Sequence, residues 1–225
     1  MKSRLKGIFQ VLIPLSIPLI LIMGTIRFLL TPVFVRFEYH LPYFPPDRYG
    51  FSDEERLRYA QGARQYLVTE AEIDVLGDLR FQDGSPLYND RELRHMEDVK
   101  QVLQGAFRAL YAAVVLLILG GVWAWREKKW NVFWKSLARG GILTVFLLVS
   151  TLLLAAVGFQ TLFVIFHRIF FEGDTWIFRY SDTLIRLFPI VFWRDAFLVL
   201  GTLTAGLGLI TAVLFGRISK RMKGD

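Results

Sequence analysis

The stretch GGILTVFLLVSTLLLAAVGFQTLFVIF, residues 140–166, contains no charged side chain. A membrane-spanning helix needs about 20 consecutive, mostly apolar residues, so this stretch predicts one span. Three further stretches have similar length and composition, at residues 8–30, 107–125 and 196–215. Because 54% of the whole chain is also hydrophobic, we expect an all-α membrane protein with four transmembrane helices.

Basic residues beside these stretches predict the orientation of the protein. Lys and Arg gather at residues 2–6, 126–139 and 217–223, and short loops rich in them face the cytoplasm. Both termini are then cytoplasmic in a multi-pass protein of the plasma membrane. The first apolar run is too long for a cleaved signal peptide, and no small-x-small cleavage site follows it.

This orientation divides the chain into three parts. Residues 1–31 form the first transmembrane helix, and residues 32–106 form an extracytoplasmic, mainly helical cap. Residues 107–225 contain transmembrane helices two to four, with an interfacial segment at residues 167–195. Any site in the cap or in the interfacial segment therefore faces the outside of the cell.

The composition excludes several functional classes. Residues 32–108 hold 14 acidic and 10 basic side chains. The net charge of +7 therefore comes from the cytoplasmic flanks and predicts no nucleic-acid partner. The chain has no Cys, which excludes disulfides, iron–sulfur clusters and a thiol nucleophile. We expect no cofactor and a monomeric protein.

Capping residues predict two helices in the cap. Ser52 and Glu55 form a capping box that begins a helix over residues 53–67, and Asn89 with Glu92 begins a second helix that leads into the next span. Between them, LRFQDGSPLY has a turn between two short apolar arms and predicts a small hairpin or tight loop. After the third span, residues 182–193 alternate polar and apolar side chains like a helix on the membrane surface.

Two of the three histidines lie in these outer segments. His95 stands in RELRHMEDVK, residues 91–100, with Asp98 three residues later on the same helix face. His167 stands in the aromatic stretch FHRIFF, where the third span ends. A titratable imidazole at the acyl-chain boundary can act on an ester or an amine there.

These motifs resemble those of a known family. HMEDVK, FHRIFF, the Trp that follows and DTLIRLFP are similar to the pattern of the lipoprotein intramolecular transacylase (Lit) family of Gram-positive bacteria. The four-span layout with a large first outer segment also matches, so the resemblance covers essentially the whole chain.

The resemblance implies a reaction. Such enzymes move one acyl chain from the diacylglyceryl group on the N-terminal cysteine of a lipoprotein to the α-amino group of that cysteine, which gives the lyso form. It also implies two cooperating catalytic histidines, which the motifs place at His95 and His167. The partners are then a diacylglyceryl lipoprotein and the membrane lipid.

The residue chemistry is compatible with this reaction. An attacking amine must lose a proton and the leaving alkoxide must gain one, and imidazole exchanges protons near neutral pH. Which histidine is the base stays open. We expect Asp98 to accept a hydrogen bond from His95 and fix its tautomer. A straight helix would lift His95 about 16 Å above the membrane boundary, at 1.5 Å per residue, so we expect a break or tilt near Gly105.

Other residues receive supporting roles. Glu38, in the FE pair of the first outer segment, and Asp182 are either salt-bridge partners within the cap or groups that orient the histidines. Phe170 and Trp176 belong to an aromatic belt that prefers the lipid headgroup level, and we expect them to contact substrate. His40 is expected to pack or cap a loop.

Three alternatives stay open. The protein is a transacylase, or a lipid esterase, or a non-enzymatic chaperone or lipid-binding assembly factor that uses its aromatic rim. The absence of a G-x-S-x-G motif argues against a serine esterase. The absence of HxxxH and HExxH spacing argues against a metal site.

Overall fold

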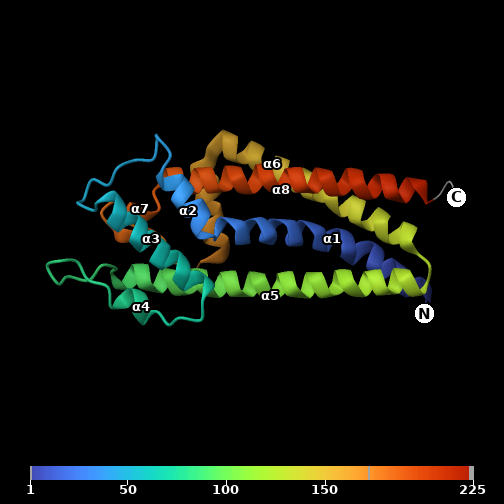
Figure 1. Cartoon of the computed structure of the whole chain (residues 1–225), viewed down its shortest axis with the longest axis horizontal. Helices are drawn as coiled ribbons and strands as arrows, with labels where there is room; N and C mark the ends of the chain where they lie inside the picture. The colour runs from blue at the N-terminus through green and yellow to red at the C-terminus, as the bar shows by residue number, and fades with distance from the viewer. Residues whose placement is uncertain (1, 172, 223–225) are drawn as a thin grey trace. The chain divides into compact units, whose positions relative to one another are not determined.

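The computed structural model describes residues 2–171 and 173–222. Within them the chain forms eight α-helices and no β-strand (Figure 1). Four helices are long: α1 (Lys2–Leu29), α5 (Asp90–Arg126), α6 (Trp130–Phe170) and α8 (Ile190–Arg221). Four are short: α2 (Pro32–Tyr39), α3 (Asp53–Val68), α4 (Asp74–Gly77) and α7 (Thr183–Leu187).

Each of the four long helices is apolar enough to cross a membrane. The expectation of an all-helical membrane protein with four spans is therefore confirmed. The helices extend beyond the predicted apolar stretches because polar turns at their ends continue the same hydrogen-bonded ladder. The longest, α6, has 41 residues where the sequence predicted 27.

The chain folds into two compact units. The first contains residues 1–26, 106–157 and 198–225. Parts of α1, α5 and α6 meet in its buried core, which is made of Ile13, Ile17, Ala124, Phe133 and Leu137. Inside a bilayer, such helices associate through close packing rather than through exclusion of water, so side-chain size at the contacts matters.

Glycines bring α6 and α8 together within this unit. A Cβ atom added at Gly141 would lie 2.5 Å from the backbone nitrogen of Ala212 and 2.5 Å from the carbonyl oxygen of Gly208. The two backbones therefore touch at a point where only a hydrogen atom fits. Small residues allow this approach at helix interfaces in membranes.

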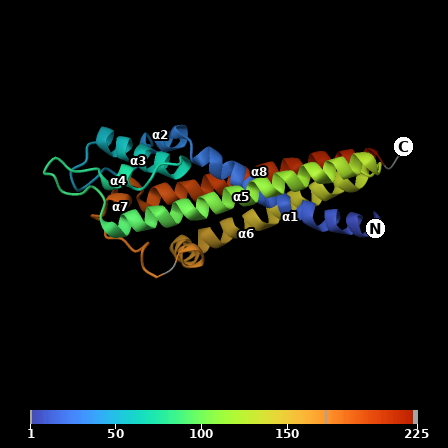
Figure 2. The same cartoon turned by 90° about the horizontal axis from the view of Figure 1, so that it is seen from below.

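The second unit contains residues 27–105 and 158–197. Within it, α3 packs beside α2, α4 and α7 (Figure 2). The predicted capping box at the start of α3 is present: Ser52 Oγ accepts from the Glu55 backbone N–H, and the Glu55 carboxylate accepts from that of Ser52. The segment between α4 and α5 is the predicted tight loop, with a single antiparallel bridge between Arg80 and Pro86.

Helix α5 begins with the predicted cap, but it does not have the predicted break. Asn89 and Glu92 exchange hydrogen bonds of 2.9 Å and 3.1 Å, as a capping pair should. The predicted break near Gly105 is wrong, because α5 is one continuous helix of 37 residues. Flanking good helix formers and an unbroken i to i−4 ladder outweigh the helix cost of a single glycine, which is about 1 kcal/mol.

The departure from helical geometry lies in α6 instead. Gly158 has φ −165° and ψ 74°, so the helix is kinked there. His167 follows nine residues later, on the last turns of α6. The direction of this terminal segment is therefore set at Gly158.

The predicted surface helix over residues 182–193 is also wrong as a single element. Helix α7 ends at Leu187, Phe188 has φ −125° and ψ 71°, and α8 begins after Pro189. A proline disfavours helical backbone at the residue before it and lacks the N–H that would continue the ladder. The alternation of polar and apolar side chains in the sequence continues past this proline, whereas helix α7 ends before it.

The contact at Gly141 gives a test of this packing. We expect Gly141→Ala to lower the thermal unfolding midpoint in detergent, because the added methyl group meets backbone that must move away. Overpacking of this kind costs about 1–3 kcal/mol. The matched control is Gly206→Ala on α8, where a Cβ atom meets nothing within 4 Å. Equal midpoints for the two variants would contradict the close approach.

Candidate active site

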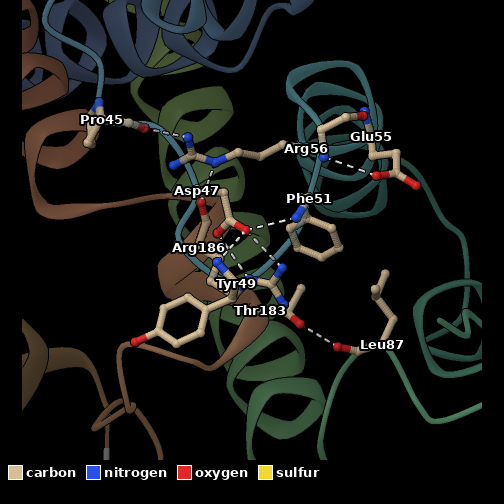
Figure 3. Close-up of polar contacts among 10 residues, drawn as sticks. Pro45, Asp47, Tyr49, Phe51, Glu55, Arg56, Leu87, Thr183 and Arg186 are labelled. Carbon is tan, nitrogen blue, oxygen red and sulfur yellow. Dashed lines mark hydrogen bonds and ion pairs between the residues drawn. The ribbon is translucent and has the colours of Figure 1, made fainter. Parts of the chain in front are cut away.

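A short helix, α7, anchors the segment that leads from α6 to α8. The Thr183 hydroxyl donates to the carbonyl oxygen of Leu87 (Figure 3). The Leu184 N–H donates to Oε1 of Glu92 at 2.7 Å, and the Tyr39 hydroxyl donates to the carbonyl oxygen of Leu187 at 2.6 Å. Helix α7 is therefore held by α2, by α5 and by the segment that precedes α5.

Two arginines complete this anchoring (Figure 3). The Arg186 guanidinium donates to both carboxylate oxygens of Asp47, at 3.1 Å and 3.0 Å, and lies 3.6 Å from the centre of the Phe51 ring. Arg56 donates at 2.6 Å to the carbonyl oxygen of Arg186 and at 2.6 Å to that of Pro45. The two cations thus tie α3 and the segment before it to α7.

Both side chains of this ion pair are buried, with 6% of Arg186 and 2% of Asp47 exposed. Burial alone raises the pKa of such a carboxyl group. Hydrogen bonds from Arg186 and from the backbone N–H groups of Phe51 and Tyr49 outweigh that effect, and the pKa of Asp47 lies below its ordinary value. The group is therefore charged at neutral pH.

The structure brings His95 and His167 together. His95 lies on α5 and His167 on the last turns of α6, and their ring centroids are 6.1 Å apart with the planes at 21°. Each residue is only 9% exposed. Burial disfavours a charged imidazolium and so does a second cation nearby, so the pair favours the neutral form.

Aromatic rings enclose the two imidazoles. The Phe171 ring lies 5.0 Å from His95 and 5.5 Å from His167, between centroids. Phe178 lies 5.2 Å from His95, and Trp176 lies 5.0 Å from His167. Phe163, one turn before His167, lies 4.1 Å from it. Aromatic rings therefore cover much of the surface of the pair, which agrees with its low exposure.

The hydrogen bonds of the ring nitrogens differ between the two histidines. His167 Nδ1 lies 2.8 Å from the carbonyl oxygen of Phe163. A carbonyl oxygen only accepts, so Nδ1 carries the proton, and the neutral ring presents its lone pair at Nε2. His95 Nδ1 is buried and has no hydrogen-bond partner. His167 thus has a fixed tautomer, and His95 does not.

The expected hydrogen bond between Asp98 and His95 is wrong. Within residues 2–171 and 173–222, His95 Nδ1 has no partner and no bond joins the two side chains. Asp98 instead lines a cavity of about 380 Å³ beside the histidines. The residues that line this cavity come from α5 and from the segment around the end of α6: Arg94, Glu97, Asp98, Gln101, Val102, Phe170, Phe171 and Thr175.

The other predicted residues lie in different surroundings. Phe170 lines the cavity, and its ring lies 4.9 Å from that of Phe166. Asp182 accepts a hydrogen bond from the Arg179 backbone N–H at 2.8 Å and precedes α7, so it stabilises a turn. His40 is exposed, with Nδ1 2.6 Å from the carbonyl oxygen of Arg36.

Glu38 is buried on α2 and is only 1% exposed. Its Oε2 atom has no hydrogen-bond partner. Burial, and after it the negative charge of Asp195, raises the pKa of Glu38 to about 7, while Arg194 acts in the opposite direction. Neither a hydrogen bond nor a ring contact connects Glu38 to the histidines in the part of the chain that the structure describes.

Sequence reasoning missed Phe163 and Phe178 as neighbours of the pair and Thr175 as a residue that lines the cavity. Phe163 precedes His167 by four residues, and helical spacing places such residues side by side. The sequence therefore contained a signal for this contact. Phe178 and Thr175 lie in an irregular segment without periodicity, so no sequence pattern predicted their positions. No group of three or more His, Asp or Glu side chains with metal-binding geometry occurs among the described residues.

Comparison with known proteins identifies the family. The model of the family described as lipoprotein intramolecular transacylase Lit matches residues 11–193, which is most of the chain. The chain belongs to the Lit family. It is also 31% identical, over 98% of its length and 99% of the relative, to an uncharacterized protein of Aquifex aeolicus (strain VF5).

Solved structures of a Lit protein share the fold. The in meso structure of Lit from Bacillus cereus has a TM-score of 0.82 to this chain at 20% identity, covering 99% of this chain and 100% of that one. A variant of that protein with one histidine replaced by alanine has a TM-score of 0.70 at 20% identity, covering 99% and 97%. At this identity the likeness establishes the fold and not the site.

The ion pair between Asp47 and Arg186 gives a stability test. We expect Asp47→Asn to lower the free energy of unfolding by about 3–5 kcal/mol, because it leaves a buried guanidinium without its partner. Thermal unfolding in detergent measures this change. The matched control is Glu54→Gln, an exposed carboxylate in the first turn of α3, which should have little effect.

The same pair gives a pH dependence. The pKa of Asp47 is lowered in the folded protein. Its contribution is therefore complete above the unfolded pKa of about 3.9 and is lost as pH falls through the lower folded value. The wild type should lose this part of its stability only below about pH 4. A difference between wild type and Asp47→Asn that persists well below this range would contradict the assignment.

Proposed function

We propose that this protein is an intramolecular transacylase. It moves an acyl chain from the diacylglyceryl group on the N-terminal cysteine of a lipoprotein to the α-amino group of the same cysteine. Family membership supports the reaction. The observation that carries the proposal is the pair of buried imidazoles, 6.1 Å apart, inside an aromatic shell.

The proton transfers follow from the fixed tautomer of His167. The lone pair of His167 Nε2 accepts a proton from the amine as its nitrogen attacks the ester carbonyl carbon. A carbon–nitrogen bond forms, the carbon–oxygen bond to glycerol breaks, and the same proton passes to the leaving glycerol oxygen. The ester and the amine become an amide and an alcohol, and no external proton is consumed.

His95 acts in its neutral form in this scheme. Its buried ring has no hydrogen-bond partner at Nδ1, so substrate atoms are free to use it. As a hydrogen-bond donor it stabilises charge on the leaving glycerol oxygen without becoming an acid itself. This division of roles requires only one mobile proton, which agrees with the cost of placing two imidazolium ions side by side.

The apolar shell supports amine transfer over hydrolysis. Phe163, Phe171, Trp176 and Phe178 pack on the histidines, and a dry site protects the ester from attack by water. The donor and the acceptor belong to one molecule, so proximity supplies much of the acceleration. The cavity beside the pair, lined partly by charged side chains, suits the polar part of the substrate.

The proposed reaction takes place on the outer side of the membrane. The basic residues at both termini and between α5 and α6 support a cytoplasmic location for these segments. The unit formed by residues 27–105 and 158–197 is then an extracytoplasmic cap, and its histidines act at the outer face of the plasma membrane. Mature lipoproteins present their lipidated cysteine at such a surface.

The test is mass spectrometry of a lipoprotein co-expressed with this protein. We expect a lyso form with one N-linked acyl chain, and we expect His95→Ala and His167→Ala each to abolish it. The matched control is His40→Ala, which removes an exposed imidazole outside the site and should leave conversion unchanged.

Other outcomes favour the alternatives. Loss of an acyl chain without N-acylation would identify an esterase, and an unchanged lipoprotein would identify a binding protein. Near wild-type conversion by either site variant would contradict the paired-histidine mechanism.

A further inference from the structure

Several buried polar atoms lack a hydrogen-bond partner, and half of them belong to the histidine pair, to its aromatic shell or to the cavity that shares Phe171 with that shell. Among residues 2–171 and 173–222, six such side-chain atoms occur, and three belong to His95, Thr175 and Trp176. A buried polar group left unpaired costs about 1–3 kcal/mol, so such groups are normally satisfied. Their concentration at one place indicates that a bound molecule supplies the missing partners.

Trp176 is the ring of the shell that carries a hydrogen-bond donor. Its indole lies 5.0 Å from His167, with the planes at 35°, and its Nε1 atom is buried without a partner. The other rings around the pair belong to phenylalanines, Phe163, Phe166, Phe171 and Phe178.

Packing alone does not explain this indole. A phenylalanine would cover His167 as its neighbours do, without burying an unpaired N–H. The chain contains three other tryptophans that are not exposed, Trp123, Trp130 and Trp134, and none of them has a buried indole nitrogen without a partner. Among the tryptophans that are not exposed, Trp176 is therefore the one whose indole nitrogen is both buried and without a partner.

The chemistry of acyl transfer requires a donor of this kind. When the amine attacks, the carbonyl oxygen gains negative charge, and a fixed N–H in a dry site stabilises that charge strongly. A neutral indole N–H is suited to this role because it donates, never accepts and does not titrate. Attack on the acyl group directed by His167 Nε2 places the reacting carbonyl beside the ring on which Trp176 packs.

We propose that the Trp176 indole N–H binds the carbonyl oxygen of the transferred acyl chain and stabilises the oxyanion of the tetrahedral intermediate. The inference rests on the proposed function, since it assigns a catalytic role within that reaction. The N–H donates to the oxygen while the new carbon–nitrogen bond forms, and it keeps its own proton. When the glycerol oxygen leaves, the carbonyl re-forms as the product amide.

The decisive variant is Trp176→Phe, which keeps an aromatic ring on His167 and removes only the donor. With a synthetic diacylglyceryl lipopeptide in detergent, we expect kcat to fall by about 10²–10³-fold, the loss that follows removal of one oxyanion donor. The midpoints of the pH–rate profile should stay unchanged, because no titratable group is altered. The matched control is Trp193→Phe, whose ring packs on Phe163, Phe188 and Phe192, and it should keep wild-type kcat.

A binding measurement on the wild-type protein gives an independent readout. A phosphonate that mimics the tetrahedral intermediate should shift the ¹⁵N-indole proton resonance of Trp176 downfield. It should also bind Trp176→Phe more weakly by a factor similar to the loss in kcat. If the variant is less stable than its control, the wild-type resonance decides the question.

Two results overturn the inference. They are a kcat of Trp176→Phe equal to that of Trp193→Phe, and a Trp176 resonance that does not move when the phosphonate binds. Failure of the proposed function looks different, because the wild type would then form no N-acyl lipopeptide at all. A working wild type with an equally active Trp176→Phe removes only the role of the indole.

Discussion

One buried carboxylate connects the two segments that form the site. Glu92 is 1% exposed, and its two oxygens serve different helices. Oε2 accepts from the Asn89 backbone N–H at 2.9 Å and closes the N-terminus of α5, whereas Oε1 accepts from the Leu184 N–H at 2.7 Å and closes that of α7. A carboxyl group is favourable at both helix starts, because each presents backbone N–H groups that have no acceptor within the helix.

This connection determines where the histidines are covered. His95 follows Glu92 on the next turn of α5, and α7 ends the irregular segment that brings Trp176 and Phe178 onto the two imidazoles. The ion pair of Asp47 with Arg186 then holds α7 from the opposite direction. A site that must exclude water depends on a cover that does not open freely, and an irregular segment obtains such rigidity only from hydrogen bonds at its ends. Buried polar groups around the site thus hold the aromatic rings over the two imidazoles.

Local signals in the sequence predicted the spans, the two caps and the histidines. Apolar length gave the four long helices, and the short-range patterns of Ser52 with Glu55 and Asn89 with Glu92 gave the helix starts. Contacts between distant residues carried no such signal. The bond from Glu92 to Leu184 joins positions 92 residues apart, and that from Asp47 to Arg186 joins positions 139 apart. The expected partner of His95 was its sequence neighbour Asp98, but a short side chain three residues away on the same helix reaches the cavity and not the ring. The break expected at Gly105 is absent from α5, and the kink at Gly158 in α6 had no signal in the sequence.

We infer that the histidine pair transfers an acyl chain within one substrate molecule. A crossover experiment distinguishes this intramolecular transfer from transfer between molecules. Two diacylglyceryl lipopeptides are mixed with the purified protein, one with deuterated acyl chains on an unlabelled peptide and one with ordinary chains on a ¹³C-labelled peptide. Mass spectrometry then reads which chain is amide-linked to which peptide. If transfer is intramolecular, each peptide carries its own chain on its α-amino group. Deuterated chains on the ¹³C-labelled peptide would show transfer between molecules and would contradict it.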